Sequence, residues 1–499
     1  MAHAESPSRR DFIASLAAAA ACTLRATTDA AEAAPPTRPN ILFIMADDLG
    51  WTDLACFGSR YYETPRLDRL AAQGVRFTAA YTNGPNCAPT RACLMSGKYT
   101  PRHGIFTVGD PVRGRIETRK LLPPKNNTTL PTDEITVAEA LKTAGYATAH
   151  MGKWHLGAPP TAGPKAQGFD VNIAGTHAGH PPTYFSPYRI KTLPDGPKGE
   201  YLTDRLTHEA LQFIDAHKDK PFFLYLPHFA VHTPIQAKKA LIAKYKAKPP
   251  AGKHANPTYA AMIESMDQGI GRILDKLDQL GIADRTVVVF TSDNGGVGGY
   301  RDAGIPTGDI THNAPLRGGK GMLYEGGIRV PLIVRWPGTT KPGTVCHEPV
   351  ISLDYYPTLC DIAGARPPAK QKLDGESLVP LLKGAEKLRR EAIFWHFPAY
   401  LQAGRGALRT APAGAIRKGP LKLIEFFETG KTELYHLGDD IGERTDLAEK
   451  LPEKAAELHG LLVAWRKAVD APIPQPNPKY DPNAPPPAKR RRRAPKAKS

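Results

Sequence analysis

A chain of 499 residues is long enough for one large domain with an appended subdomain, or for two domains. Its composition, 41% hydrophobic and 23% charged, is typical of a soluble globular protein and excludes a disordered or an integral membrane protein. The formal net charge of +17 at pH 7 favours anionic partners or substrates, although the basic tail after residue 484 contributes part of it.

The first 34 residues are predicted to form a twin-arginine export signal. Arg9 and Arg10 precede a short apolar run, and the small residues "AEAA" at 31–34 supply a cleavage site. The alternative is a short buried helix, but the run is too short to span a bilayer and is followed by prolines. We therefore expect the twin-arginine machinery as a partner, a periplasmic or secreted bacterial protein, and no transmembrane segment.

The cysteines leave one thiol to be explained. Cys22 would be removed with the signal, and an odd number without a C-x-x-C pair remains: Cys56, Cys87, Cys93, Cys346 and Cys360. This pattern argues against both a structural zinc site and a disulfide-dense scaffold. From the residues alone, Cys87 could be a structural thiol, a disulfide partner, a thiolate nucleophile or the precursor of a more reactive group.

Short β-rich runs alternate with helical patterns through the main domain, which is expected over residues 35–375. Five runs open into polar or glycine-rich loops: 40–50, 146–157, 221–234, 285–296 and 330–338. Apolar residues spaced by three and four from Ile263 to Leu280 predict an amphipathic helix, and 135–145 predicts another. The alternation indicates an α/β fold with a large mixed, mostly parallel sheet sandwiched by helices.

The pattern changes near residue 376. Short stretches typical of antiparallel strands come first, and 451–469 predicts a terminal amphipathic helix. We therefore expect a smaller C-terminal α+β subdomain over 376–470. The proline- and arginine-rich tail over 471–499 is expected to be disordered.

Polar residues directly follow the predicted strands, where ligands of parallel sheets bind. They should converge on one rim: Asp47, Asp48, Lys153, His155, His232, Asp293 and Asn294. Asp47, Asp48, Asp293 and Asn294 are an all-oxygen set suited to Ca²⁺ or Mg²⁺, although each pair alone would be read as a helix cap or a turn. Lys153, His155, His232 and Lys320 suit a centre that binds a tetrahedral oxyanion and moves protons, and Arg91 adds a fixed donor.

The stretch "CAPTRACLMSG" from Cys87 resembles the signature of the sulfatase family, C/S-x-P-x-R. Further family-like motifs follow in order between residues 38 and 470: "ILFIMADDLGW", "GKWHLG", "HTP", "SDNGG", "LRGGKGMLYEGGIRVP" and "ELYHLGDD". The resemblance implies an alkaline-phosphatase-like fold, with the catalytic domain over 35–375. It also implies hydrolysis of sulfate esters.

The resemblance assigns roles residue by residue. Cys87 matches the precursor of formylglycine (3-oxoalanine), made by a formylglycine-generating enzyme that recognises Pro89 and Arg91; Thr90 stands where serine is commoner. One Ca²⁺ would be bound by Asp47, Asp48, Asp293, Asn294 and the modified residue 87. Lys153 and Lys320 match sulfate-binding cations, His155 the base and His232 the residue near the leaving group. His177 and His180 are candidates for one further polar contact.

The substrate is encoded weakly. Residues 175–188, 394–400 and 401–419 are expected to line the pocket, and their arginine, histidine and aromatic content favours a sulfated carbohydrate over a steroid or a small aryl sulfate. One alternative is a phosphonate monoester or phosphodiester hydrolase of the same superfamily. Another is an inactive protein that binds sulfated glycans. No nucleic-acid recognition module accompanies the basic charge.

Overall fold

The computed structural model describes residues 38–404 and 407–484. A nine-stranded sheet forms the centre of this part of the chain, in the order β10-β2-β8-β7-β1-β6-β4-β5, with β9 paired to β2. Among the described strands of this sheet, only β8 runs antiparallel to its neighbours, which confirms the mostly parallel sheet. Its strands are β1 (Asn40–Ala46), β2 (Val75–Tyr81), β4 (Ala147–Met151), β5 (Val171–Ile173), β6 (Phe222–Pro227), β7 (Thr286–Ser292), β8 (Arg329–Arg335), β9 (Thr344–Cys346) and β10 (Val350–Ile351).

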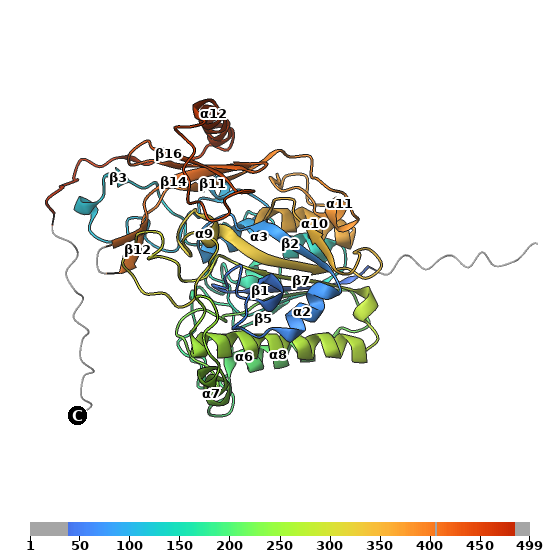
Figure 1. The fold of residues 1–499 in the computed structure, drawn as a ribbon. Coiled ribbons are helices and arrows are strands. Elements are labelled where there is room, and N and C mark those ends of the chain that lie inside the picture. Colours follow the sequence, from blue (N-terminus) through green and yellow to red (C-terminus); the bar gives the residue numbers. More distant parts are fainter. Residues whose placement is uncertain (1–37, 405–406, 485–499) are drawn as a thin grey trace, which may run out of the picture. The chain divides into compact units, whose positions relative to one another are not determined.

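Helices cover both faces of this sheet (Figure 1). Successive side chains of a strand point to opposite faces, so Leu42 and Ile44 of β1 belong to one apolar core and Ile41 and Phe43 to the other. The first core contains residues of α2 (Pro65–Ala72), α6 (Leu202–Ala216) and α8 (Pro257–Gln279). The second contains residues of α3 (Cys87–Ser96), α5 (Val137–Thr143) and α10 (Tyr355–Ala363). Burial on both faces explains why the strands are continuous apolar runs.

The two predicted helices form where expected, and both begin at a side-chain cap. Asn256 precedes α8 and its side chain accepts from the backbone N–H groups of Thr258 and Tyr259, both at 3.1 Å. Thr136 and Glu139 form a reciprocal capping box at the start of α5. Shorter helices complete the main part: α4 (Thr100–His103), α7 (Lys239–Ala247), α9 (Glu325–Ile328) and α11 (Val379–Leu382).

A four-stranded antiparallel sheet follows, and it confirms the predicted C-terminal strands. It has the order β11-β14-β15-β16, with β11 (Ala392–Phe397), β14 (Ala413–Lys418), β15 (Leu421–Phe426) and β16 (Thr432–His436). The predicted terminal helix is α12 (Pro452–Ala468), whose Leu458 and Leu462 pack on β14–β16 in a small core of their own. A separate hairpin, β12 (Leu401–Gly404) with β13 (Ala407–Thr410), lies between β11 and β14 in sequence.

A buried ionic cluster joins the small sheet to the main part; we call it the seam cluster. The Lys422 ammonium of β15 lies 2.9 Å from Glu325 Oε1 of α9 and 2.9 Å from Glu443 Oε1, and all three side chains are fully buried. The Tyr81 hydroxyl of β2 donates to Glu325 Oε2 at 2.6 Å, and Arg329 Nη1 donates to the same oxygen at 3.1 Å. The backbone N–H of Glu325 donates to Glu443 Oε2 at 2.7 Å. Strands from both sheets therefore share one hydrogen-bonded network.

The prediction that the C-terminal tail is disordered was wrong for its first residues. Residues 471–484 were expected to be disordered, but Gln475–Pro476 (β17) pairs with Leu121–Leu122 (β3). The Asn477 side chain donates to two carbonyl oxygens of the preceding loop, those of Ile116 and Arg119. These hydrogen bonds involve backbone and side-chain amide groups, so the segment can be ordered even though its composition is poor in apolar residues. The export signal, Cys22 and the arginine-rich end lie outside the described residues, and none of the described helices is long and apolar enough to cross a membrane.

Candidate active site

The signature segment folds into α3, a helix with every residue buried and with Cys87 as its first residue. The chain enters through Asn86 in an extended conformation, and the Thr90 hydroxyl donates back to the Gly84 carbonyl oxygen at 3.2 Å. A Cβ atom on Gly84 would lie 2.8 Å from Pro89 Cγ, so the turn requires glycine there. This tight entry holds the Cys87 side chain at the rim of the sheet.

The acidic residues meet because two neighbouring strands end in register. Ala46 of β1 pairs with Ser292 of β7, and Asp47 and Asp48 therefore emerge beside Asp293 and Asn294. Asp48 has a φ of +64°, and its N–H donates to Asp293 Oδ1 at 3.2 Å. The Asn294 amide donates to Asp48 Oδ1 at 2.8 Å. The predicted convergence at the carboxyl ends of the strands is confirmed for this group.

Each of the three carboxylates has its own cation. Lys153 Nζ lies 2.8 Å from Asp47 Oδ2, and both side chains are fully buried. Arg91 Nε and Nη2 donate to Asp293 Oδ2 at 2.9 and 2.8 Å. Lys320 Nζ lies 2.5 Å from Asp48 Oδ1 and 3.4 Å from Cys87 Sγ. Lys320 is therefore the cation that links the acidic cluster to the cysteine.

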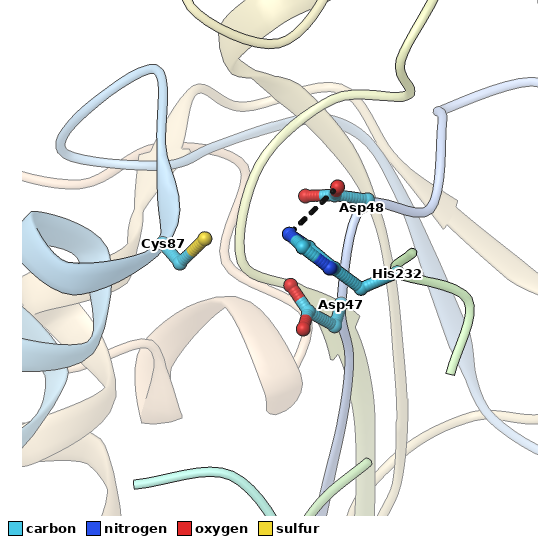
Figure 2. A group of neighbouring side chains, drawn as sticks. All are labelled: Asp47, Asp48, Cys87 and His232. Atoms are coloured by element: carbon cyan, nitrogen blue, oxygen red, sulfur yellow. Dashed lines mark ion pairs between the residues drawn. The ribbon is translucent and has the colours of Figure 1, made fainter. Parts of the chain in front are cut away.

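This cluster has the donor atoms of a hard cation site. Ligand atoms of Asp47, Asp48, Cys87 and His232 lie within 4.8 Å of one another, and Figure 2 shows the four side chains turned toward one another. Two buried oxygens, Asp47 Oδ1 and Asn294 Oδ1, have no hydrogen-bond partner among the described residues. Buried acceptors are ordinarily paired, so these oxygens fit a bound cation. His232 Nε2, 3.6 Å from Asp48 Oδ2, is an addition to the predicted donor set.

Burial and the neighbouring charges shift the pKa values of these groups in different directions. Burial and the carboxylate of Asp293 raise the pKa of Asp47 well above its usual value, which a cation at its free oxygen would offset. Burial alone would raise the pKa of Asp48, but Lys320, His232 and Lys153 outweigh it and hold that pKa low. Burial raises the pKa of the Cys87 thiol despite Lys153 and Lys320. An unmodified Cys87 is therefore a thiol at neutral pH, which argues against a thiolate nucleophile.

Two histidines of the site are neutral. Burial lowers the pKa of His155 well below its usual value, helped by Lys153 and Arg91. Burial also lowers the pKa of His232, to about 3. Gly179 lies so close to His155 that a Cβ atom there would be 2.6 Å from the imidazole Cε1, and His155 Nδ1 has no partner among the described residues. The loop over 175–188 thus packs directly on the predicted base.

The site opens into a cavity of about 300 Å³. It is lined by Asn86, Cys87, Val108, Arg113, His155, Gly179, His180, His232, Lys320, Leu401, Gln402 and Arg409. His180 lies over His232, with ring centroids 6.0 Å apart and an interplanar angle of 3°, whereas His177 contacts the ring of His155 and is not among the lining residues. The sequence did not predict that Arg113 lines the cavity, because no motif or pattern around this residue connects it with the site.

The remaining cysteines form no disulfide. Cys56, Cys87, Cys93, Cys346 and Cys360 are all free thiols, whereas the odd count alone required only one of them to be unpaired. The Cys93 sulfur lies 3.4 Å from His103 Nε2, and both side chains are buried. Cys87 is the cysteine that lines the cavity.

Comparison with known proteins gives consistent matches over most of the chain. The family model described as "Sulfatase" matches residues 39–365, and the one described as "N-sulphoglucosamine sulphohydrolase, C-terminal" matches residues 319–467. The chain is 36% identical to a "Sulfatase" of Formosa agariphila, covering 87% of this chain and 90% of that protein. It is 34% identical to the steryl-sulfatase of Mus musculus, covering 80% and 74%. The crystal structure of Ps i-CgsB in complex with k-i-k-neocarrahexaose aligns with a TM-score of 0.71 at 30% identity, covering 86% and 93%.

Proposed function

The chain belongs to the sulfatase family and is a sulfuric ester hydrolase, and from this we propose that it works through a formylglycine made from Cys87 and one bound Ca²⁺. One observation carries the proposal. Cys87 lies at the cavity 3.4 Å from the Lys320 ammonium, beside an acidic cluster that leaves two buried oxygens unpaired. A structural thiol would need neither the cation nor the acids.

Asp47, Asp48, Asp293, Asn294 and residue 87 would hold the calcium ion. Bound there, Ca²⁺ and the hydrated aldehyde would together supply an activated hydroxyl nucleophile and compensate negative charge on the transferring group. Asp47 Oδ1 and Asn294 Oδ1 are the oxygens that the protein leaves available for it.

The chain's own cations would bind and orient the sulfate. Lys320 is placed between Asp48 and Cys87, so its ammonium can donate to a sulfate oxygen or to the leaving oxygen. Lys153 and Arg91 are buried behind the cavity wall, where each is paired with a carboxylate. Arg91 also donates to the Lys153 carbonyl oxygen at 2.7 Å, which fixes the two relative to each other.

The histidines would move protons at the two ends of the reaction. Because His155 is neutral and its Nδ1 has no partner among the described residues, it can accept a proton from residue 87. His232 Nδ1 lies 2.8 Å from the Thr233 carbonyl oxygen, which fixes the proton of the neutral ring on that nitrogen; Nε2 would take up a proton from water before passing it to the leaving oxygen.

We propose a sulfated carbohydrate as the substrate. The cavity wall is cationic and imidazole-rich, through Arg113, Arg409 and His180, which suits an anionic sugar better than a flat apolar ring. The oligosaccharide complex of the similar Ps i-CgsB structure supports this class, whereas the steryl-sulfatase relative shows that family membership alone does not determine it. We also propose export by the twin-arginine route, on the basis of Arg9 and Arg10.

The experiment that tests this function combines mass analysis and a substrate panel. Protein produced with a formylglycine-generating enzyme should give a peptide around residue 87 with the mass of the aldehyde form. It should cleave an aryl sulfate or sulfated saccharides faster than a phosphodiester or a phosphonate monoester. A preference for the phosphorus esters would assign it to the hydrolase alternative, and binding of sulfated glycans without turnover by the aldehyde form would make it a binding protein.

A further inference from the structure

Arg409 lines the cavity, yet no step of sulfate transfer uses it. Its guanidinium carbon lies 4.7 Å from the ring centroid of Tyr300, and the Tyr300 hydroxyl donates to the Lys320 carbonyl oxygen at 2.9 Å. Arg409 also packs against the next residue of that loop, since a Cβ atom on Gly321 would lie 3.2 Å from Arg409 Cδ. The guanidinium is thereby held beside the Lys320 loop.

Arg113 reaches the same cavity from the loop that precedes β3. Its Nη2 donates to the Val108 carbonyl oxygen, and Arg119 donates to the Arg113 carbonyl oxygen. The loop is joined to the residue before β12 by the Tyr400 N–H, which donates to the Pro111 carbonyl oxygen at 2.8 Å. Like Arg409, Arg113 has an Nε that is shielded from solvent and has no partner among the described residues.

The two guanidinium groups lack a compensating carboxylate in the cavity. No acidic residue is found among the described residues that line it, and neither arginine forms an ion pair with a described residue. Burial lowers the pKa of Arg113; the nearby Asp110 carboxylate, which is not among the residues that line the cavity, opposes this shift, and the charge of Arg409 adds to it. Two like charges that face one small cavity are stabilised by an anion from outside.

We propose that Arg113 and Arg409 form a second anion subsite, which binds a further anionic group of the substrate while Lys320 and residue 87 engage the ester that is cleaved. The group would be a sulfate or a carboxylate, both of which match the planar fork of arginine. The proposal rests on the proposed function and refines it: the preferred substrate carries at least two anionic groups.

The test is competitive inhibition of aryl sulfate hydrolysis. Sucrose octasulfate is the polysulfated probe, an oligogalacturonate is the carboxylate-only probe, and inorganic sulfate is the single-anion reference. In Arg113→Gln and Arg409→Gln, the ratio of the probe Ki to the inorganic sulfate Ki should rise about tenfold each, as expected for loss of a charge-assisted hydrogen bond. Arg409→Lys, which retains the charge, should recover part of the effect. Arg389→Gln removes an arginine whose side chain is 96% exposed outside the cavity, and it should leave the ratio unchanged.

The outcomes separate this proposal from the function on which it rests. An aldehyde-bearing wild-type enzyme that cleaves no sulfate ester would overturn the function itself. An active enzyme whose Ki ratio is the same in the two glutamine variants as in Arg389→Gln would overturn the subsite alone. If only the octasulfate ratio changes, the bound group is a sulfate; if only the oligogalacturonate ratio changes, it is a carboxylate.

Discussion

The seam cluster and the active-site cluster both contain buried ion pairs, and they differ in whether every carboxylate or amide oxygen has a partner among the described residues. In the seam cluster, both oxygens of Glu325 and both oxygens of Glu443 accept hydrogen bonds. In the active-site cluster, Asp47 Oδ1 and Asn294 Oδ1 accept none from the described residues. Complete pairing is what a purely structural cluster requires, because an unpaired buried polar atom costs free energy. A cation bound at the site, as proposed above, would complete the pairing of these two oxygens.

The largest expected effect is on activity and comes from the cysteine. Cys87→Ala should reduce kcat/KM for an aryl sulfate by at least about a thousandfold, because it removes the atom from which the nucleophile is made. The thermal midpoint should change little, since the thiol makes few polar contacts. Cys56→Ala is the matched control, and equal loss of activity in the two variants would contradict a special role for Cys87.

A substitution in the seam cluster should have the opposite pattern of effects: it should lower stability and leave activity unchanged. Glu325→Gln leaves Lys422 and Arg329 buried with a weaker acceptor, so the free energy of unfolding should fall by about 3–5 kcal/mol. Urea denaturation followed by circular dichroism measures it. Glu391→Gln, at a carboxylate that is 81% exposed, should be nearly neutral. Activity per folded molecule that remains normal in Glu325→Gln would confirm the contrast between the clusters.

Calcium should stabilise the protein through the active-site cluster. At a Ca²⁺ concentration of about 100 times the Kd, the free energy of unfolding should rise by about 2.7 kcal/mol relative to chelated enzyme. Thermal unfolding with and without a chelator measures the difference. Asp47→Asn weakens the acceptor left free in the cluster and should lose most of this stabilisation. Glu325→Gln should retain it, and an equal loss in both variants would argue against a site at Asp47.

The smallest expected effect is a pH dependence of stability from the seam cluster. Burial raises the pKa of Glu443 to about 7, although Lys422 opposes the shift. A raised folded-state pKa means that its contribution to stability is complete below the unfolded value near 4.5 and is lost as the pH rises through 7. The free energy of unfolding of the wild type, measured between pH 5 and 8, should therefore fall by about 1–3 kcal/mol as the pH rises. In Glu443→Gln, whose side chain cannot titrate, this decrease in the free energy of unfolding should be absent.

The sequence predicts the active-site rim better than the seam. Asp47 and Asp293 each follow a continuous apolar run, so local pattern and sheet topology together place them at one edge. Lys422 lies within a strand whose alternation suggests a solvent-facing side chain, and its partner Glu325 is 97 residues away. No local pattern encodes such a pair. Pairing of β17 with β3 is hidden for a related reason, because a proline-rich composition predicts disorder and says nothing about backbone partners.

The hairpin that carries Arg409 has a consequence for engineering. Strand β12 pairs with β13 and with no other described strand, whereas the residues that would hold calcium and sulfate come from α3, the large sheet and its loops. Of the two arginines in the proposed subsite, Arg409 lies on this hairpin and Arg113 on another loop, and neither is among the residues that would hold calcium and sulfate. Grafting this hairpin from a relative would exchange the part of the cavity wall that carries Arg409, provided that the graft keeps the packing of Leu401 against the loop of Lys320.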